Sequence, residues 1–262
     1  MHSEGFMNVA IITGASSGIG KEFFLSLKER KEQYDEIWVI ARNREKLEEL
    51  RALTEVPLRI FSLDLSKDEA YVAFEQALKE EQPSIRLLIC ASGFGRFESI
   101  ENDDLATLTN MVDLNCNGVI GITKPAIPYL AEGSLVIVIA SIAAMQPIPY
   151  IATYAASKAF VLSYARALNR ELKSHKSRCL AVCPFWTKTA FFDRAKSENP
   201  IVKKYVVMYD PKDIVKRTWH DAKNKRKDVS ICGAYTRGQR LLVKLLPHRI
   251  VMNVWMNQQK LK

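Results

Sequence analysis

The segment Thr13-Gly14-Ala15-Ser16-Ser17-Gly18-Ile19-Gly20 decides the fold of this chain. It follows an apolar run over 9–13 and precedes a helical pattern over 21–31. Glycines at such a junction let the backbone turn sharply and approach a pyrophosphate, whose charge is met by the amides at the helix N-terminus. An ordinary strand-to-helix turn is the alternative, but the position after the first strand of a β-α-β unit favours a nucleotide. The candidate cofactor-binding residues of this turn are Gly14, Ser16, Ser17, Gly18, Ile19 and Gly20.

Beyond this turn, apolar and β-rich runs alternate with helical patterns. The runs expected to form strands cover 9–13, 36–41, 58–63, 87–90, 135–140, 180–183 and 229–232. Helical patterns over 44–53 and 68–81 lie between them, and Ser66 with Glu69 is expected to form a capping box at the start of the latter. Strands that are apolar on both faces and separated by helices imply a parallel sheet covered on both sides. We therefore predict one doubly wound (Rossmann-type), three-layer α/β domain over 7–236, with a seven-stranded, mainly parallel sheet.

The composition excludes several classes of protein. Hydrophobic residues make up 48% of the 262 residues and charged residues 26%, which excludes intrinsic disorder, collagen and low-complexity chains. The longest purely apolar run has six residues, whereas a membrane-spanning helix needs about 20. The first residues lack the pattern of a secretory signal, so we expect a cytoplasmic protein. The five cysteines include no C-x-x-C pair, and we interpret them as buried reduced thiols rather than as disulfide or metal ligands.

The positive charge is concentrated near the C-terminus. Residues 211–262 carry 13 Lys or Arg and three Asp, which gives this segment a charge of +10. Because the net charge of the whole chain is +9, residues 1–210 together carry a charge of −1. From 237 to 262, apolar residues alternate with basic ones, and no acid is present. We predict a basic, amphipathic extension over 237–262, which Pro247 divides into two short helices. It could lie on an anionic membrane with Trp255 at headgroup level, cover a substrate cleft, or reach a partner subunit.

A second group of residues carries the pattern of an acid–base site. Tyr154 and Lys158 are four apart in a helical stretch and therefore share one face. A tyrosine has a reference pKa near 10, and a neighbouring ammonium lowers it, which makes the phenol usable as a general acid or base. Ser141 ends a strongly apolar strand, where its hydroxyl can hydrogen-bond a substrate carbonyl. Asn115 lies in a helical region, where an asparagine is neither a favoured helix former nor a core residue.

Taken together, these residues resemble the short-chain dehydrogenase/reductase family over roughly 7–232. The glycine spacing G-x-x-x-G-x-G and the four residues above occur in the order and at the separations of the single-domain branch of that family. The resemblance implies that Tyr154 exchanges a proton with the substrate oxygen and that Ser141 positions the carbonyl. It implies that Lys158 lowers the tyrosine pKa and holds the nicotinamide ribose, and that Asn115 holds a water in a proton relay.

The end of the second strand bears on the choice of cofactor. An NAD site would place an acid there to bind the ribose 2′-hydroxyl, but this chain has Ala41-Arg42-Asn43. A guanidinium can hold a 2′-phosphate bidentately, so Arg42 and Asn43 are candidate ligands and NADPH is expected over NADH. A solvated arginine at the start of a helix is the alternative. The resemblance also implies that Asp64 contacts the adenine, although it could be only a turn acid.

Two segments depart from the family pattern. Cys90-Ala91-Ser92-Gly93 stands where Asn-Asn-Ala-Gly is typical, so other groups must replace the hydrogen bonds of the two asparagines. The segment 184–189, Pro-Phe-Trp-Thr-Lys-Thr, stands where Pro-Gly-x-Val-x-Thr is typical. Within it, Thr189 matches the threonine that holds the nicotinamide carboxamide, and Thr187 is a further candidate cofactor ligand. Phe185 replaces a glycine, so we expect a differently shaped pocket beside the nicotinamide.

The expected function is that of an NADPH-dependent carbonyl reductase or alcohol dehydrogenase, assembled as a homodimer or homotetramer and acting on a small molecule. Bulky apolar residues border the expected substrate site: Phe94, Phe97, Met145, Trp186, Phe191 and Phe192. They suit a lipid-like or steroid-like carbonyl substrate. The alternative is that these side chains pack the loops against their own scaffold. A non-catalytic NADPH sensor would usually have lost the tyrosine or the lysine. A nucleic-acid-binding protein would explain the basic tail only, so no nucleic acid is expected. A sugar-nucleotide epimerase shares Tyr-x-x-x-Lys but is usually longer.

Overall fold

One parallel sheet organises the molecule. The computed structural model describes residues 6–195, 201–202 and 204–261, and in these ranges seven strands form the sheet. The strands are β1 (Asn8–Thr13), β2 (Glu36–Ala41), β3 (Leu58–Ser62), β4 (Ser84–Cys90), β5 (Leu130–Ile139), β6 (Arg178–Val182) and β7 (Val229–Ser230). Their order is β3-β2-β1-β4-β5-β6-β7, and every neighbouring pair is parallel. The predicted seven-stranded sheet is therefore confirmed. Residues 196–200 and 203 of the predicted domain, and residue 262 of the predicted extension, lie outside the described residues.

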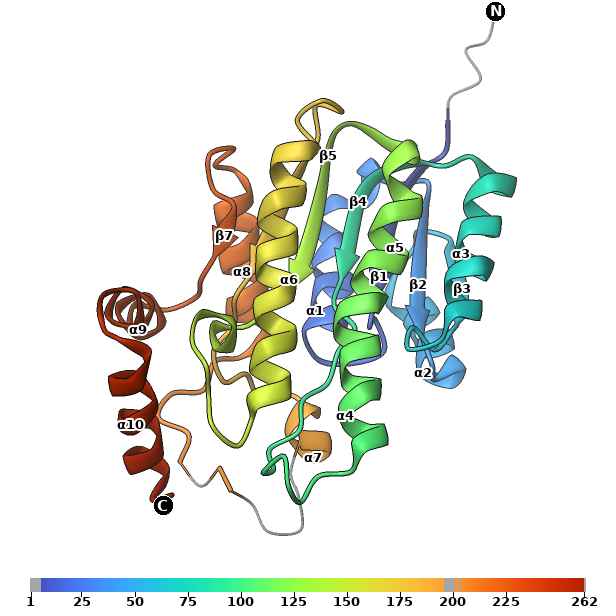
Figure 1. Cartoon of the computed structure of the whole chain (residues 1–262). Helices are drawn as coiled ribbons and strands as arrows, with labels where there is room; N and C mark the ends of the chain where they lie inside the picture. The colour runs from blue at the N-terminus through green and yellow to red at the C-terminus, as the bar shows by residue number, and fades with distance from the viewer. Residues whose placement is uncertain (1–5, 196–200, 203, 262) are drawn as a thin grey trace, which may run out of the picture.

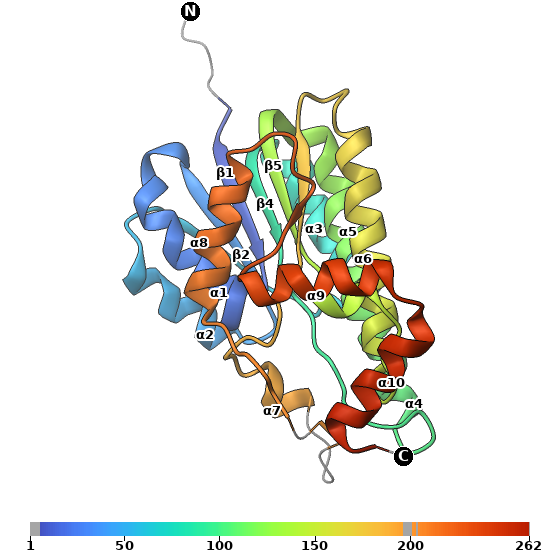
Figure 2. The same ribbon diagram turned by 90° about the vertical axis from the view of Figure 1, so that its left-hand side faces the viewer.

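Helices cover both faces of the sheet, as Figures 1 and 2 show. One layer contains α1 (Gly18–Ser26), α2 (Arg44–Glu48) and α8 (Pro211–Ala222). The other contains α3 (Asp68–Glu81), α4 (Leu105–Val112), α5 (Gly118–Ala126) and α6 (Ala152–Glu171). Because successive side chains of a strand point to opposite faces, Val9 and Ile11 of β1 pack into one layer and Ala10 and Ile12 into the other. This double burial explains the continuous apolar runs in the sequence.

Some local boundaries differ from the prediction. The capping box is wrong: α3 begins after Lys67 without a side-chain cap, and the Ser66 hydroxyl instead donates to Oδ1 of Asp64 at 2.9 Å. Lys67 occupies the N-cap position of α3, so Ser66 lies one residue before the position that a capping box requires. β7 pairs with β6 only at Val229 and Ser230, so the last strand ends two residues earlier than the predicted run.

The C-terminal segment forms two helices, α9 (Ala234–Leu245) and α10 (His248–Gln259), separated at Pro247. The expected division at this proline is therefore observed. Figure 2 shows both helices on the side of the molecule that faces the viewer, with α9 crossing in front of the sheet and α10 at the lower right. No helix in the described part of the chain is long and apolar enough to cross a membrane.

Candidate active site

The candidate site is a cavity of about 370 Å³ at the carboxyl ends of the strands. Its lining includes a residue that follows each of the first six strands: Gly14, Arg42, Leu63, Gly93, Ser141 and Pro184. The strand order reverses between β1 and β4, and in open α/β sheets ligands bind at the carboxyl ends beside such a reversal. The fold alone therefore brings together side chains that lie far apart in the sequence.

The glycine turn after β1 forms one end of this cavity. Gly14 and Gly18 have φ values of +69° and +56°, which favour glycine. A Cβ on Gly14 would lie 2.8 Å from the backbone of Ala91, so a side chain has no room there. Helix α1 begins at Gly18 without a side-chain cap. Ser16, Ser17 and Ile19 line the cavity beside these uncapped amides, and this arrangement fits the pyrophosphate of a dinucleotide.

The segment after β2 presents a cation and no acid. Arg42 lines the cavity with its side chain 52% exposed, and its Nη1 lies 4.0 Å from Oδ2 of Asp64. Most donors of this guanidinium therefore remain available to a ligand. Asn43 also lines the cavity, but its Oδ1 caps α2 by accepting a hydrogen bond from the amide of Lys46 at 2.9 Å. Oδ1 of Asp64 is engaged in its own turn with Ser66. An adenine contact of Asp64 stays a prediction.

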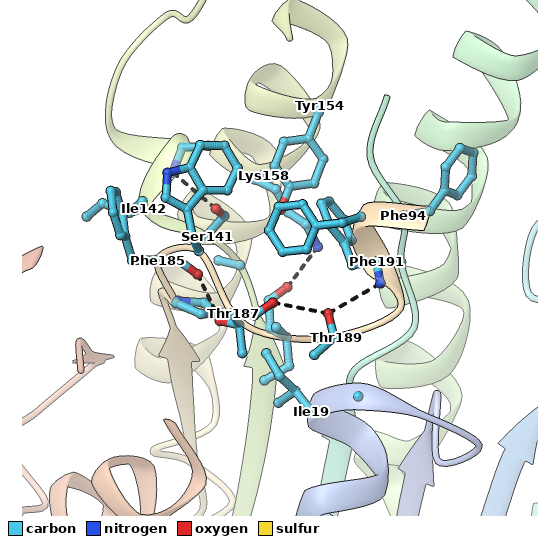
Figure 3. Close-up of a pocket in the computed structure, with 18 of the residues that line it drawn as sticks. Ile19, Phe94, Ser141, Ile142, Tyr154, Lys158, Phe185, Thr187, Thr189 and Phe191 are labelled. Atoms are coloured by element: carbon cyan, nitrogen blue, oxygen red, sulfur yellow. Dashed lines mark hydrogen bonds between the residues drawn. The ribbon is translucent and has the colours of Figure 1, made fainter. Parts of the chain in front are cut away.

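Tyr154, Ser141 and Lys158 meet at the next part of the cavity (Figure 3). Tyr154 lies near the start of α6, and Ser141 follows β5, so that both hydroxyl-bearing side chains line this part of the cavity. The Ser141 hydroxyl accepts a hydrogen bond from the amide of Ala143 at 3.1 Å. Burial of the phenol raises the pKa of Tyr154 to about 12, and the neighbouring Ser141 side chain acts in the opposite direction. The phenol is therefore protonated at neutral pH and can donate a proton.

Lys158 is buried one helical turn farther along α6. Lys158 is only 5% exposed, and its Nζ donates a hydrogen bond to the carbonyl of Ile139 at 2.9 Å. Burial lowers the pKa of this ammonium to about 8. Nζ lies 5.9 Å from the centre of the Tyr154 ring. Desolvation of the phenol dominates its pKa in this structure, and a lowering of that pKa by Lys158 stays a prediction.

Asn115 occupies a π-helical turn (Asp113–Asn117) between α4 and α5, and it is completely buried. Its Nδ2 donates to the carbonyl of Phe94 at 2.9 Å and to the Ser157 hydroxyl at 3.0 Å. Its Oδ1 accepts from the amide of Phe94 at 3.1 Å. The amide thus ties the segment after β4 to helix α6, and a π turn is a common device for aiming such a side chain. The water relay expected for Asn115 stays a prediction.

The structure also explains the unusual segment after β4. The Thr13 hydroxyl accepts hydrogen bonds from the amides of Ala91 at 3.0 Å and Ser92 at 3.2 Å, so this segment is held without the two asparagines. A Cβ on Gly93 would lie 2.8 Å from Oδ1 of Asn115 and 3.3 Å from Nζ of Lys158. The glycine is therefore required by the close approach of two site residues. Sequence reasoning missed Thr13, although its place at the end of β1 was a usable signal.

The segment after β6 lies against the glycine turn. A Cβ on Gly18 would come within 3.3 Å of Cγ2 of Thr189. The Thr187 hydroxyl donates to the carbonyl of Phe185 at 2.8 Å, and the Thr189 hydroxyl accepts from the amide of Phe191 at 3.3 Å. Both threonines line the cavity, and their contacts with the cofactor stay predictions. The ring of Phe185 packs on Tyr235 of α9, with 5.6 Å between centroids, so the residue in place of the glycine contacts the C-terminal helices.

The aromatic residues divide into cavity-lining and supporting groups. Phe94, Trp186, Phe191 and Phe192 line the cavity as expected. Phe97 does not line it, because its ring is buried behind the cavity against Trp186, Phe191 and Phe192. Met145 also points elsewhere and packs against the main core. The first four residues therefore form the wall of the pocket, whereas Phe97 and Met145 pack against the scaffold.

The C-terminal helices supply a further wall, whose residues sequence reasoning did not assign. The residues concerned are Tyr235, Gln239, Trp255, Gln258 and Gln259. Nε1 of Trp255 donates to the carbonyl of Pro149 at 3.0 Å. Gln259 exchanges two hydrogen bonds with the backbone of Lys204, at 3.0 and 3.1 Å. The spacing of Val251, Trp255 and Gln259, four residues apart, was the signal that one face of α10 is buried.

Comparison with known proteins places most of the chain in one family. The model of the family described as short chain dehydrogenase matches residues 8–200. A very-long-chain 3-oxoacyl-CoA reductase from Neurospora crassa is 34% identical over 175 residues, which are 63% of this chain and 51% of that protein. The chain therefore spans about half the length of this curated relative.

Solved structures share the fold. A short chain dehydrogenase from Burkholderia cenocepacia in complex with NADP has a TM-score of 0.75 at 20% identity, covering 98% of this chain and 99% of that chain. A short chain dehydrogenase/reductase from Burkholderia phymatum in complex with NAD has a TM-score of 0.74 at 20% identity, covering 92% of each chain. At these identities the likeness shows the fold alone, so the choice between the two cofactors depends on the residues of this chain.

Proposed function

The chain belongs to the short-chain dehydrogenase/reductase family, and we propose that it is an NADPH-dependent oxidoreductase acting on a carbonyl or a secondary alcohol. The observation that carries this proposal is that Tyr154, Ser141 and Lys158 line one cavity together with the glycine turn. The experiment is to record NADPH oxidation at 340 nm with a panel of ketones. Oxidation that depends on the ketone supports the proposal, and its absence with every ketone would count against it.

The residues of the site divide the work of the reaction between them. The chemistry that NADPH supplies when bound is hydride transfer to the carbonyl carbon. The Tyr154 hydroxyl donates a proton to the carbonyl oxygen, and the Ser141 hydroxyl orients that oxygen. The ammonium of Lys158 offsets the negative charge that forms on the phenolate. Thr187 and Thr189 hold the nicotinamide side of the cofactor. In alcohol oxidation, the same groups move the proton in the opposite direction.

Arg42 is proposed to select NADPH, and its replacement gives a direct prediction. Arg42→Ala should weaken NADPH binding by roughly 10- to 100-fold, because a charged hydrogen-bonding partner of the 2′-phosphate is lost. NADH binding should change little, since NADH lacks this phosphate. Titration of cofactor fluorescence measures both affinities.

The matched control for this prediction is Arg44→Ala. Arg44 pairs with Glu48 at 3.5 Å on the exposed side of α2 and is not among the residues that line the cavity. We expect its replacement to leave both affinities unchanged. A wild-type protein that binds NADH more tightly than NADPH would refute this role of Arg42.

The proposed substrate is a bulky apolar carbonyl compound, such as a 3-oxoacyl thioester. Two observations support this class: eight aromatic side chains line the cavity, and the Neurospora crassa relative is named as a very-long-chain 3-oxoacyl-CoA reductase. The cavity is also lined by Gln239, whose side-chain carbonyl can accept a hydrogen bond from a ligand. Oε1 of Gln239 is buried and has no hydrogen-bond partner among the described residues. A buried carbonyl without a partner costs about 1–3 kcal/mol, so a hydroxyl or amide of the bound molecule would be favoured there.

We further propose that α10 covers the substrate end of the cavity. Trp255 is only 9% exposed, and it both lines the cavity and bonds to Pro149. Trp255→Ala should therefore raise the KM for a bulky ketone by roughly tenfold and destabilise the fold by about 3–5 kcal/mol. Steady-state kinetics well below the melting temperature measure the effect.

The control for the covering role is Val254→Ala, one residue earlier on α10, whose side chain is not among those that line the cavity. Val254 is 58% exposed, and its replacement should leave KM and stability unchanged. Identical kinetics for Trp255→Ala and the wild type would show that α10 does not contribute to substrate binding.

A further inference from the structure

The outward side of the two C-terminal helices is apolar. Five aliphatic side chains make up this surface, here called the outer face: Leu241, Leu242 and Leu245 of α9, and Ile250 and Val254 of α10. They are between 46% and 73% exposed. Figure 2 shows both helices toward the viewer, with no other segment of the chain in front of them. Contacts within the described chain therefore leave these side chains open.

The exposed position of the outer face follows from helical periodicity. Residues four apart share one side of a helix, as Leu241 and Leu245 do on α9 and Ile250 and Val254 on α10. The opposite sides are buried: Thr236 and Val243 on α9, and the residues around Trp255 on α10. Both helices are thus apolar on the buried side and again on the exposed side. Packing within the chain explains the apolar residues on the buried sides of the two helices, but not those on the exposed sides.

The charge around the outer face is entirely positive. Exposed basic residues flank the aliphatic side chains: Arg237, Arg240, Lys244 and Arg249. From 229 to 262 the sequence contains no Asp or Glu. On α9, Arg237 and Leu241 lie on the same side of the helix, four residues apart, so charge and apolar surface are presented together.

We propose that the outer face binds the surface of an anionic membrane, with α9 and α10 lying in the plane of the interface. Helices that bind this way present aliphatic side chains to the acyl region and Lys or Arg to the headgroups. Each basic residue near an anionic surface adds to the attraction. The outer face supplies both groups from the same two helices, and it carries no acid that would be repelled.

Other occupants fit this surface less well. In a two-fold contact between copies of this chain, each copy would present the same patch, which would bring the basic residues together without an acid to pair with them. A nucleic acid would use the arginines and lysines, but it would gain nothing from five exposed aliphatic side chains. A lipid surface uses both features.

The location of the outer face also bears on the supply of substrate. The same helix α10 that carries Ile250 and Val254 outward lines the cavity with Trp255. On a membrane, the wall of the cavity would therefore lie at the lipid surface, where a bulky apolar carbonyl compound is concentrated. This consequence rests on the proposed function, whereas membrane binding itself does not.

The test is sedimentation of the full chain with vesicles of phosphatidylcholine and phosphatidylglycerol, compared with vesicles of phosphatidylcholine alone. We expect binding to the acidic vesicles at low salt, and roughly tenfold weaker binding at high salt or with neutral vesicles, since charge attraction is screened. The double variant Leu241→Gln/Leu245→Gln should bind acidic vesicles at least about tenfold more weakly. Its NADPH oxidation with a water-soluble ketone should match the wild type.

The matched control is Leu105→Gln, which changes an aliphatic side chain that is 73% exposed on α4. It should keep full vesicle binding. The proposal is overturned if the wild type does not sediment with acidic vesicles, or if the double variant binds them as well as the wild type does. It is also overturned if the double variant loses only self-association in analytical ultracentrifugation, or if the protein binds RNA but no vesicle. Loss of NADPH oxidation in every form, with vesicle binding retained, would refute the proposed function alone.

Discussion

Tyr154→Phe is expected to lower kcat by about 10²- to 10⁴-fold while leaving NADPH affinity almost unchanged. The variant keeps the aromatic ring, which packs on Phe191 with 5.5 Å between centroids, so the shape of the cavity is preserved. It removes the hydroxyl that donates the proton at the part of the cavity that Ser141 also lines. Steady-state kinetics and cofactor titration separate the two effects.

Tyr164→Phe is the matched control on the same helix. The Tyr164 hydroxyl is hydrogen-bonded to Thr123 at 2.7 Å, and Tyr164 is not among the residues that line the cavity. Its loss should cost about 1 kcal/mol of stability and leave turnover intact. Near-normal turnover of Tyr154→Phe, with a folded protein, would contradict the assignment of the proton donor.

Lys158→Met is expected to reduce turnover by roughly 10²-fold or more without destabilising the fold. Burial lowers the pKa of Lys158 from 10.5 to about 8, so the folded state holds fewer protons than the unfolded state between these values. The buried ammonium therefore costs about 3 kcal/mol of folding free energy below pH 8, and this cost fades as the pH rises toward 10.5. Methionine removes the cost and loses only the bond to Ile139, which is worth about 1 kcal/mol.

Urea denaturation at pH 7 and pH 10 measures this balance. The variant should be at least as stable as the wild type at pH 7, and the difference should shrink at pH 10. The control Lys173→Met, at an exposed lysine after α6, should change neither activity nor the pH dependence. A Lys158→Met protein that is clearly less stable than the wild type at pH 7 would show that the lysine serves the fold rather than the reaction.

Much of the site could be predicted from the sequence, because the fold places the carboxyl ends of parallel strands together. Apolar runs located the strands, and the residues that follow them, such as Arg42 and Ser141, were thereby assigned to one edge of the sheet. The spacing of Tyr154 and Lys158 on one helix required no tertiary information. Local periodicity and strand ends therefore sufficed for these positions.

Other features depend on packing that no local pattern contains. The depth at which Lys158 is buried, and the desolvation that raises the pKa of Tyr154, follow from residues distant in the sequence. The same holds for Phe97, which the fold places behind the cavity, and for Trp255, which joins the cavity from a helix about 100 residues away from α6. The capping box at Ser66 was wrong because α3 has its N-cap at Lys67, one residue later than predicted.

The central claim is that this protein transfers a hydride from NADPH to a carbonyl with Tyr154 as the proton donor. The most direct measurement uses NADPH deuterated at C4 and follows the label by mass spectrometry in products from 3-oxoacyl thioesters and bulky ketones. We predict deuterium on the carbinol carbon of the alcohol formed by the wild type, and a rate of label transfer reduced at least about 100-fold in Tyr154→Phe. A folded protein that binds NADPH but labels no alcohol, or equal labelling rates for both proteins, would contradict the claim.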